Sequence, residues 1–412
     1  MQKIAVIGCG FSGLSFTAQL VENLKQAKHS PIFIDIYDKS ANIPRGLAYS
    51  TQDPDHLLNV PAYRMSALNN DPNHLVNWLK SKKYNYTSTD FIPRKIYGDY
   101  LESVLENLLQ TRCAYVKIYK ENVDFIAENF NILGRKYDFV ILATGNEPKN
   151  IPGTISAFDH ANIEKICSPK VVICGSNLTM VDTVITLSKN VNIQQITAIS
   201  RHSFLPKVHK LSLSSLGIRP IITPQDAQNL TLSALIAKFH REIAKLPNWR
   251  MGFDSIRPIS QEIWQNLPHK SQVKFLRKLM PYYAKFRHRM PPHQAKIIQD
   301  LIQKGRLKLM PGDIHKMALN TDIPVINCTG IELNVAKSRN YLLQNLIKCK
   351  LLTPHPTKVG IKQSNHPRLL VISPILTGEL GEIFAVPELR KLAHDCAEKV
   401  LNFTAQHRHQ EP

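Results

Sequence analysis

The sequence predicts an α/β protein with two Rossmann-like dinucleotide-binding domains and an inserted helical region. Two strand–glycine–helix–strand units indicate the two domains, one starting at Lys3 and the other at Lys170. Apolar residues at helical spacing from Leu230 to Leu307 indicate the helical region. We therefore expect the following division of the chain: a discontinuous first domain over 1–165 and 320–412, a second nucleotide unit over 166–225, and the helical region over 226–319.

The first unit carries the pattern G-x-G-x-x-G. The apolar run Ile4–Ile7 ends at Gly8, and Gly10 and Gly13 complete the pattern before a helix-spaced stretch. Gly8 permits a tight turn, Gly10 leaves room for a pyrophosphate, and Gly13 lets the helix pack close to the strand. The alternative is a Gly-rich turn of an ordinary α/β domain, which the complete register of elements disfavours.

The second strand of this unit ends beside an acid. Asp38 follows the strand 33–37 and lies 25 residues beyond Gly13, where a carboxylate can accept hydrogen bonds from ribose hydroxyls. The helix N-terminus offers N–H groups and a partial positive charge to the pyrophosphate. We therefore predict four further cofactor-binding residues: Phe11, Ser12, Asp38 and Lys39.

The composition limits the function classes without selecting one. The chain has 52 Lys and Arg against 32 Asp and Glu, a net charge of +20, which favours anionic partners such as phosphorylated cofactors, nucleic acid or acidic membrane. The basic residues are spread along the chain, as in a solvated basic surface. Seven dispersed cysteines without a C-x-x-C pair argue against a zinc site and a redox disulfide, and they suit a reducing cytoplasm. No apolar run is long enough to span a membrane.

The stretch from Ile43 to Ala62 predicts a long ordered loop at the strand ends of the sheet. Arg45 in this loop is a candidate phosphate partner, with an ordinary surface arginine as the alternative. Beyond it we expect two helices, 73–79 and one ending near Leu109, and then three short antiparallel strands: 116–119, 123–126 and 130–133. A sheet strand, 137–142, then ends at Thr144 and Gly145.

Several motifs together resemble the bacterial FAD-NAD(P)-binding family, flavoproteins distantly similar to the flavin-dependent lysine and ornithine N-hydroxylases. The motifs that carry the resemblance are Arg45-Gly46-Leu47-Ala48-Tyr49-Ser50, His56-Leu57-Leu58-Asn59-Val60-Pro61-Ala62, Met65-Ser66-Ala67, Asp71-Pro72, Phe91-Ile92-Pro93-Arg94, Trp249-Arg250, Phe286-Arg287-His288-Arg289-Met290, Asn327-Cys328-Thr329-Gly330 and Ala385-Val386-Pro387-Glu388-Leu389-Arg390. They span nearly the whole chain.

The resemblance implies FAD, a reduced nicotinamide donor and a cytoplasmic oxidoreductase, but no particular substrate. It implies that the first glycine turn holds FAD, with Thr144 and Gly145 closing the first domain. It also implies that Asn59, Met65 and Ser66 lie at the reactive face of the flavin, where we expect Ser66 to take part in catalysis.

The second unit departs from the dinucleotide pattern. Its turn keeps Gly175, but Asn177 stands where the second glycine is expected and Met180 where the third is expected. Arg201 follows the second strand of the unit, where an arginine suits the 2′-phosphate of NADP. We therefore expect NADPH to be preferred over NADH if this unit binds a dinucleotide.

The helical region contains the segment Arg287-His288-Arg289-Met290-Pro291-Pro292. Two arginines flanking a histidine can hold an anion near a proton donor, and we expect His288 to be that donor. The alternative is a solvated helix end whose basic residues complement the helix dipole.

The last part of the chain returns to the first domain. A strand ends at Thr329 and Gly330, mirroring Thr144 and Gly145. Gly378 and Ala385 lie at a strand–glycine–helix junction that, in related flavoproteins, lies against the flavin, although a plain turn is the alternative.

We therefore expect an FAD-dependent oxidoreductase that takes hydride from NADPH and passes it to O2 or an organic acceptor, acting on a small molecule without a metal. The alternative is a non-catalytic nucleotide-binding flavoprotein whose basic surface engages nucleic acid, although the chain lacks the interleaved basic and aromatic clusters of single-strand binders. The sequence leaves the oligomeric state open.

Overall fold

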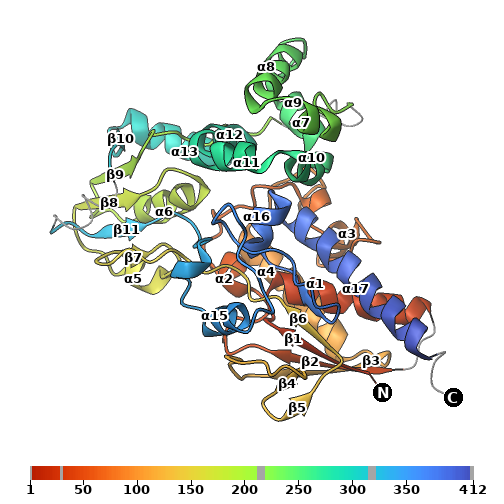
Figure 1. Ribbon diagram of the computed structural model, residues 1–412. Helices are drawn as coiled ribbons and strands as arrows, with labels where there is room; N and C mark the ends of the chain where they lie inside the picture. The colour runs from red at the N-terminus through yellow and green to blue at the C-terminus, as the bar shows by residue number, and fades with distance from the viewer. Residues whose placement is uncertain (1, 28–30, 211–218, 314–321, 409–412) are drawn as a thin grey trace. The chain divides into compact units, whose positions relative to one another are not determined.

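The computed structural model describes residues 2–27, 31–210, 219–313 and 322–408 (Figure 1). It divides into two compact units: unit 1 comprises 1–52, 60–147 and 333–412, and unit 2 comprises 53–59 and 148–332. Each unit contains its own five-stranded parallel sheet, so the predicted α/β fold class is confirmed. In the described part of the chain, no helix is both long and apolar enough to cross a membrane.

The sheet of unit 1 has the strand order β12-β6-β1-β2-β3. Its strands are β1 (Lys3–Ile7), β2 (Ile32–Tyr37), β3 (Ala114–Tyr119), β6 (Phe139–Leu142) and β12 (Leu369–Val371). All neighbouring strands are parallel. The first strand lies at the centre and the chain winds outward from it in both directions. The strand order therefore reverses between β1 and β6, which is where doubly wound sheets bind ligands.

Helices flank this sheet. They are α1 (Phe11–Gln26), α2 (Gly46–Tyr49), α3 (His74–Ser81), α4 (Arg94–Leu109), α15 (Tyr341–Lys348), α16 (Thr377–Leu380) and α17 (Val386–Arg408). The amino-terminal helix α1 packs against the carboxyl-terminal helix α17. Gln19 Nε2 donates to the Arg390 carbonyl oxygen at 3.1 Å, and Asn23 Nδ2 donates to Glu398 Oε1. The last segment of the chain is thus part of unit 1.

The prediction of three antiparallel strands between residues 116 and 133 is wrong in part. Only β4 (Asn131–Ile132) and β5 (Arg135–Lys136) pair antiparallel, whereas β3 pairs parallel with β2 and 123–126 is not a strand. As an edge strand, β3 alternates buried and exposed residues, and its sequence therefore has the pattern of a half-exposed antiparallel strand.

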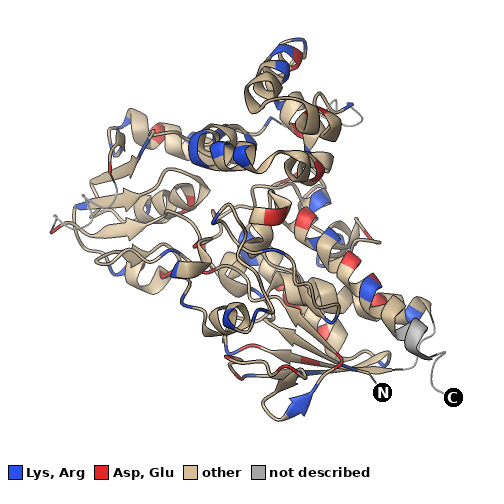
Figure 2. Cartoon of the chain, in the orientation of Figure 1, with Lys and Arg blue, Asp and Glu red and all other residues tan. Residues whose placement is uncertain are grey.

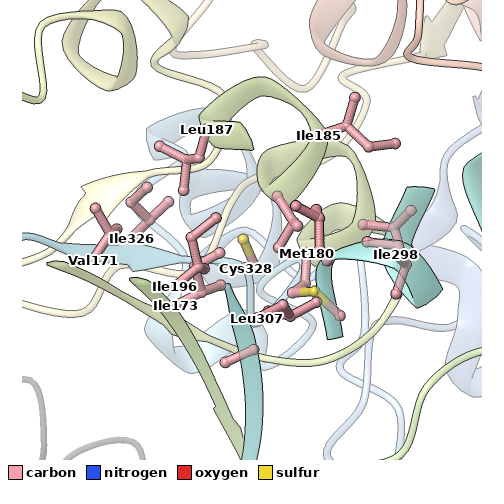
Figure 3. Close-up of a cluster of buried hydrophobic side chains, with 14 of the residues drawn as sticks. Val171, Ile173, Met180, Ile185, Leu187, Ile196, Ile298, Leu307, Ile326 and Cys328 are labelled. Atoms are coloured by element: carbon pink, nitrogen blue, oxygen red, sulfur yellow. The ribbon is translucent and has the colours of Figure 1, made fainter. Parts of the chain in front are cut away.

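The sheet of unit 2 repeats the arrangement of the first, with the order β10-β9-β8-β11-β7. Its strands are β7 (Ile155–Ser156), β8 (Lys170–Cys174), β9 (Gln195–Ser200), β10 (Leu307–Pro311) and β11 (Val325–Asn327). Here β8 is central, and the order reverses between β8 and β11. Figure 3 shows the core beneath this sheet, where Ile173 and Ile326 pack with Met180 and Ile298.

The observed boundaries lie at 147/148 and 332/333 instead of the expected 165/166 and 319/320. Both β7 and β11 pair in the second sheet, although we expected residues 148–165 and 320–332 in the first domain. A short apolar strand followed by Thr-Gly fits either sheet, because both sheets bury such strands on two faces.

The helices of unit 2 include the predicted helical region. They are α5 (His160–Glu164), α6 (Leu178–Ser188), α7 (Pro224–Asn229), α8 (Leu232–Ile243), α9 (Trp249–Ile256), α10 (Ser260–Asn266), α11 (His269–Lys274), α12 (Met280–Arg287) and α13 (Pro292–Gln303). A π-helical turn, Phe275–Leu279, joins α11 to α12. Helices α7 to α10 enclose a separate apolar core that includes Ala227, Leu235, Ile256 and Trp264. Residues 314–319, at the end of the expected region, lie outside the described residues.

Candidate functional site

Three glycines shape the turn from β1 into α1. A Cβ atom on Gly8 (φ +106°) would lie 2.2 Å from the Ala143 carbonyl oxygen, and one on Gly13 would lie 2.0 Å from the Gly8 carbonyl oxygen. A Cβ on Gly10 would meet no heavy atom within 4 Å. The chain's own packing therefore requires Gly8 and Gly13, whereas the cradle, the space that a side chain on Gly10 would fill, is open, as the approach of a diphosphate to the backbone requires.

The amino-terminal end of α1 faces this cradle. Gly10 is the N-cap residue, and no side chain caps the helix. The Phe11 and Ser12 side chains are buried, so these residues offer backbone N–H groups to a ligand. A 16-residue helix carries a partial positive charge at this end. Uncapped N–H groups and the dipole together form an anion-binding site.

Asp38 lies beside the same turn. Its Oδ2 accepts a hydrogen bond of 2.7 Å from the Cys9 N–H, and its Oδ1 accepts one of 2.8 Å from the Ser40 N–H. Each carboxylate oxygen has a further lone pair with which to accept a ribose hydroxyl. Burial, and secondly the Asp38 charge, raise the pKa of the Cys9 thiol to about 12. Lys39 is exposed next to this acid.

The turn from β8 into α6 begins like the first turn and then diverges. A Cβ on Gly175 (φ +117°) would lie 2.5 Å from the Cys328 carbonyl oxygen. Asn177 Oδ1 accepts a 2.9 Å hydrogen bond from the Leu178 N–H, so the chain's own side chain takes a donor at the start of α6. Met180 stands at the third-glycine position and is fully buried in the core (Figure 3). The second turn therefore offers less to a diphosphate than the first.

Residues 5–147 match the model of the family described as FAD-NAD(P)-binding. This segment is therefore similar to FAD-NAD(P)-binding domains. The match contains the whole first turn and Asp38, and it confirms over this segment the family resemblance predicted from the sequence. No curated protein matches the chain.

Solved structures similar to this chain cover nearly all of it. L-lysine 6-monooxygenase from Pseudomonas syringae has a TM-score of 0.63 at 12% identity, covering 98% of this chain and 99% of that chain. Ornithine N-hydroxylase from Kutzneria sp. 744, with reduced FAD, NADP+ and L-ornithine, has a TM-score of 0.58 at 13% identity, covering 98% and 100%. OTEMO in complex with FAD and NADP has a TM-score of 0.54 at 14% identity, covering 99% and 86%. At these identities the likeness establishes the fold, and it agrees with the predicted distant similarity to lysine and ornithine N-hydroxylases.

Arg45 contributes to the packing within unit 1. The guanidinium donates to Glu102 (Nε to Oε1, 2.7 Å), to the carboxylate of Asp99 and to the Lys95 carbonyl oxygen (3.0 Å). These contacts hold α2 against α4. The donors of Arg45 are directed at these groups of α4, and its expected phosphate contact stays a prediction.

Ser66 has a structural role in the same unit. It is fully buried, and its Oγ lies 2.6 Å from the Asp71 carbonyl oxygen and 2.9 Å from that of Leu68. These contacts explain why Ser66 is buried, and its expected catalytic role stays a prediction. The neighbouring Met65 is 3% exposed and is a core residue.

Thr144 and Gly145 follow β6 at the reversal of strand order, where a cofactor-binding role remains our prediction. Gly145 (φ +70°) accepts a hydrogen bond from Ser373 Oγ at 3.1 Å. At Gly378 a Cβ would lie 2.1 Å from the Val359 carbonyl oxygen, so close packing of the loop before β12 explains that glycine.

Unit 2 contains Asn59, which we expected at the flavin, and also Thr329 and Gly330, which we expected to bind a cofactor in the first domain. The Asn59 carbonyl oxygen accepts a 3.0 Å hydrogen bond from His209 Nε2. Thr329 donates through its N–H and its Oγ1 to Asn327 Oδ1, at 3.0 and 2.7 Å. The Gly330 carbonyl oxygen accepts a hydrogen bond of 3.0 Å from the Lys149 N–H. Thr329 and Gly330 thus end a strand of the second sheet, which corrects their placement in the first domain.

The remaining predicted residues lie in unit 2 as well. Arg201 is exposed directly after β9. His288 ends α12, and its N–H donates to the Ala284 carbonyl oxygen at 2.8 Å. The next residue, Arg289, is 3% exposed and pairs with Asp254, with Nη1 3.1 Å from Oδ2. Arg289 is therefore part of a buried ion pair, and the expected two-arginine clamp around His288 is wrong in this respect.

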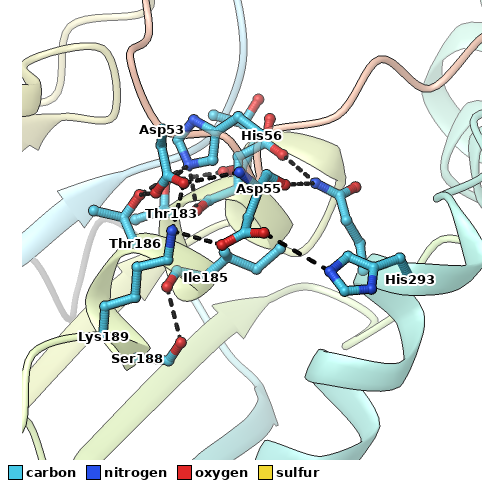
Figure 4. A network of polar contacts seen from close by, with 12 residues as sticks. Asp53, Asp55, His56, Thr183, Ile185, Thr186, Ser188, Lys189 and His293 are labelled. Atoms are coloured by element: carbon cyan, nitrogen blue, oxygen red, sulfur yellow. Dashed lines mark hydrogen bonds and ion pairs between the residues drawn. The ribbon is translucent and has the colours of Figure 1, made fainter. Parts of the chain in front are cut away.

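The segment 53–59 was not predicted as a distinct element, yet it docks on α6 through polar contacts (Figure 4). Lys189 Nζ lies 2.7 Å from Asp55 Oδ2 and also pairs with Asp53, while His56 Nε2 lies 2.8 Å from Thr186 Oγ1. The dense run Asp-Pro-Asp-His was the available sequence signal. Among the residues that the structure describes, no group of three or more His, Cys, Asp or Glu is placed to hold a metal ion.

Proposed function

We propose that the protein is an FAD-dependent oxidoreductase that accepts hydride from NADPH. The observation that carries this proposal is the first glycine turn, where the uncapped end of α1, the open cradle at Gly10 and the Asp38 carboxylate lie together. Support comes from similar structures that are an ornithine N-hydroxylase with FAD and NADP+ and an OTEMO complex with FAD and NADP.

In this proposal the N–H groups of Phe11 and Ser12 bind the FAD diphosphate, and Asp38 accepts the ribose hydroxyls. Lys39, Thr144 and Gly145 complete the site. When bound, FAD would supply the redox chemistry, the transfer of electrons from NADPH to O2 or to an organic acceptor. The chain's own residues bind, orient and shield that cofactor.

In unit 2 we propose that Gly175 and Arg201 bind NADPH and that His288 donates a proton to the substrate. The substrate is a small molecule and the location is cytoplasmic, which the dispersed cysteines favour. The alternative of a non-catalytic nucleic-acid-binding flavoprotein gains no support from the comparisons.

The test is purification followed by anaerobic mixing with NADPH or NADH in a stopped-flow spectrometer. We expect a yellow protein whose oxidised-flavin absorbance bleaches faster with NADPH. A protein that stays colourless after incubation with FAD, or a bound flavin that neither nucleotide reduces, would overturn the proposal.

Asp38→Ala provides the site control, and Glu121→Ala, an exposed acid of the same unit, provides the matched surface control. We expect the Asp38 variant to lose bound FAD on gel filtration and the Glu121 variant to retain it. Equal retention by both variants would remove Asp38 from the proposed site.

A further inference from the structure

Three aromatic rings gather immediately after β9 in unit 2. The His202 ring stacks on Phe204, with centroids 5.1 Å apart and planes 18° apart. The Tyr282 ring lies 5.1 Å from Phe204 and 5.4 Å from His202. His202 is exposed and Tyr282 is 48% exposed, so this ring cluster presents aromatic surface to solvent.

The ring cluster is held by backbone contacts between two segments. The N–H of Lys207 donates to the Lys285 carbonyl oxygen (2.8 Å), and the N–H of Met290 donates to the Lys207 carbonyl oxygen (2.9 Å). At the end of β9, Ser203 has φ +51° and its N–H donates to Ser200 Oγ at 3.0 Å. A non-glycine residue in the left-handed region is uncommon and is held there by the surrounding contacts. The surrounding structure therefore fixes the positions of the rings.

The sequence on both sides of Tyr282 is basic. The stretch 263–299, which includes α11 and α12, has eight Lys and Arg residues and no Asp or Glu, and seven of the eight remain when the buried Arg289, paired with Asp254, is set aside. Figure 2 shows Lys and Arg residues on α11 and α12. Lys285 Nζ lies 4.3 Å from the centroid of the Phe204 ring, and Arg201 is exposed one residue before His202. Such a field attracts an anion that also has an aromatic face.

The position in the fold selects the kind of ligand. β9 is the second strand of the dinucleotide unit, and the residues after this strand contact the adenosine ribose in such folds. A nucleotide whose phosphate meets Arg201 brings its base to the neighbouring residues. The π-face of adenine stacks on aromatic side chains, which contributes to the binding free energy.

We propose that His202, Phe204 and Tyr282 form a stacking platform for the adenine of NADPH, with Arg201 bound to its 2′-phosphate. This inference rests on the proposed use of NADPH. Because Asn177 takes a donor at the start of α6, the adenosine end of the cofactor carries most of the binding energy in unit 2. The fragment 2′,5′-ADP should therefore bind nearly as tightly as NADPH.

Calorimetric titration with 2′,5′-ADP and 5′-AMP tests this proposal, both with and without FAD. We expect 2′,5′-ADP to bind more tightly than 5′-AMP, and His202→Ala and Tyr282→Ala each to weaken it by about tenfold. Tyr282→Phe keeps the ring and should keep the affinity. Arg201→Gln should abolish the preference for 2′,5′-ADP over 5′-AMP.

Matched controls are Tyr341→Ala, a 66% exposed ring on α15, and Arg241→Gln, an exposed arginine on α8. Both should bind 2′,5′-ADP like the parent protein. Unchanged binding in the His202 and Tyr282 alanine variants would overturn the platform while leaving the proposed function intact, provided that NADPH still bleaches the flavin.

Failure to bind FAD would overturn the proposed function, and the titration without FAD would still decide the platform. A single-stranded oligonucleotide that displaces 2′,5′-ADP and loses affinity in Tyr282→Ala would also overturn the inference, because the ring cluster would then serve nucleic acid.

Discussion

The Ala143 carbonyl oxygen lies 2.2 Å from the place where a Cβ atom on Gly8 would stand, so β6 closes directly over the end of β1. The second unit repeats this relationship between Cys328 and Gly175, at 2.5 Å. In each unit the two strands that meet in this way flank the reversal of strand order. The same close approach thus builds both turns, and the residues that follow each glycine decide what the turn can bind.

The first prediction separates the two later glycines of the first turn. Gly13→Ala should lower the free energy of unfolding by about 1–3 kcal/mol, because its Cβ would overlap the Gly8 carbonyl oxygen. Gly10→Val should cost no more than about 1 kcal/mol of stability, the cost of a poorer N-cap residue, because Gly10 has φ −83° and open space at its Cβ; it should weaken FAD binding about tenfold or more. Urea denaturation and FAD titration measure the two effects. A Gly10 variant that binds FAD normally would contradict the cradle.

The second prediction concerns the Cys9 thiol beside Asp38. Burial and the nearby carboxylate raise its pKa to about 12, so almost none of it is thiolate near neutral pH. Iodoacetamide should label the exposed Cys167 and Cys349 and leave Cys9 unlabelled in the folded protein. Peptide mass spectrometry before and after denaturation checks this. Labelling of Cys9 at the rate of Cys167 would mean that the first turn opens readily.

The third prediction concerns the side chain that caps α6. Asn177→Gly frees the Leu178 N–H for a phosphate oxygen and should tighten NADPH binding about fivefold, equivalent to about 1 kcal/mol. The cost to stability is only a few tenths of a kcal/mol, since glycine is an acceptable N-cap residue. Asn340→Gly, at the cap of α15, is the matched control and should leave NADPH affinity unchanged. Weaker NADPH binding in Asn177→Gly would show that Asn177 contacts the cofactor directly.

The fourth prediction concerns pH. Burial, and secondly Arg289, lower the pKa of His209 to about 3, whereas the pKa of an unfolded histidine is about 6.5. Below about pH 6.5 the unfolded chain therefore binds a proton that the folded chain does not, and stability falls with pH until about pH 3. This amounts to about 1.4 kcal/mol between pH 7.5 and 5.5.

His209→Gln should remove that part of the pH dependence, because glutamine can still donate to the Asn59 carbonyl oxygen but does not titrate. Denaturation at the two pH values measures the difference. His240→Gln, an exposed histidine on α8, should keep the parent's slope. An unchanged slope in His209→Gln would show that His209 is protonated in the folded protein.

Much of the fold was predictable because buried parallel strands and amphipathic helices leave periodic patterns. Helix α1 and strands β1 and β2 were expected from such patterns, as was the departure at Asn177 and Met180. The predictions of strand pairing were wrong where one sequence pattern is compatible with two neighbouring strands or two sheets. β3 reads as a half-exposed strand in either kind of sheet, and β11 ends in a Thr-Gly turn that fits either unit.

The sequence by itself determined the α/β class, the glycine turn and the acid after β2, because these depend on local backbone geometry and on residues close together along the chain. Only the tertiary structure decided that Arg45 binds α4, that Ser66 is enclosed by carbonyl groups, and that His202 and Phe204 meet Tyr282 nearly 80 residues later. Those contacts join segments distant in sequence. Packing selects such partners from several chemically equivalent ones, and a single sequence carries no record of that selection.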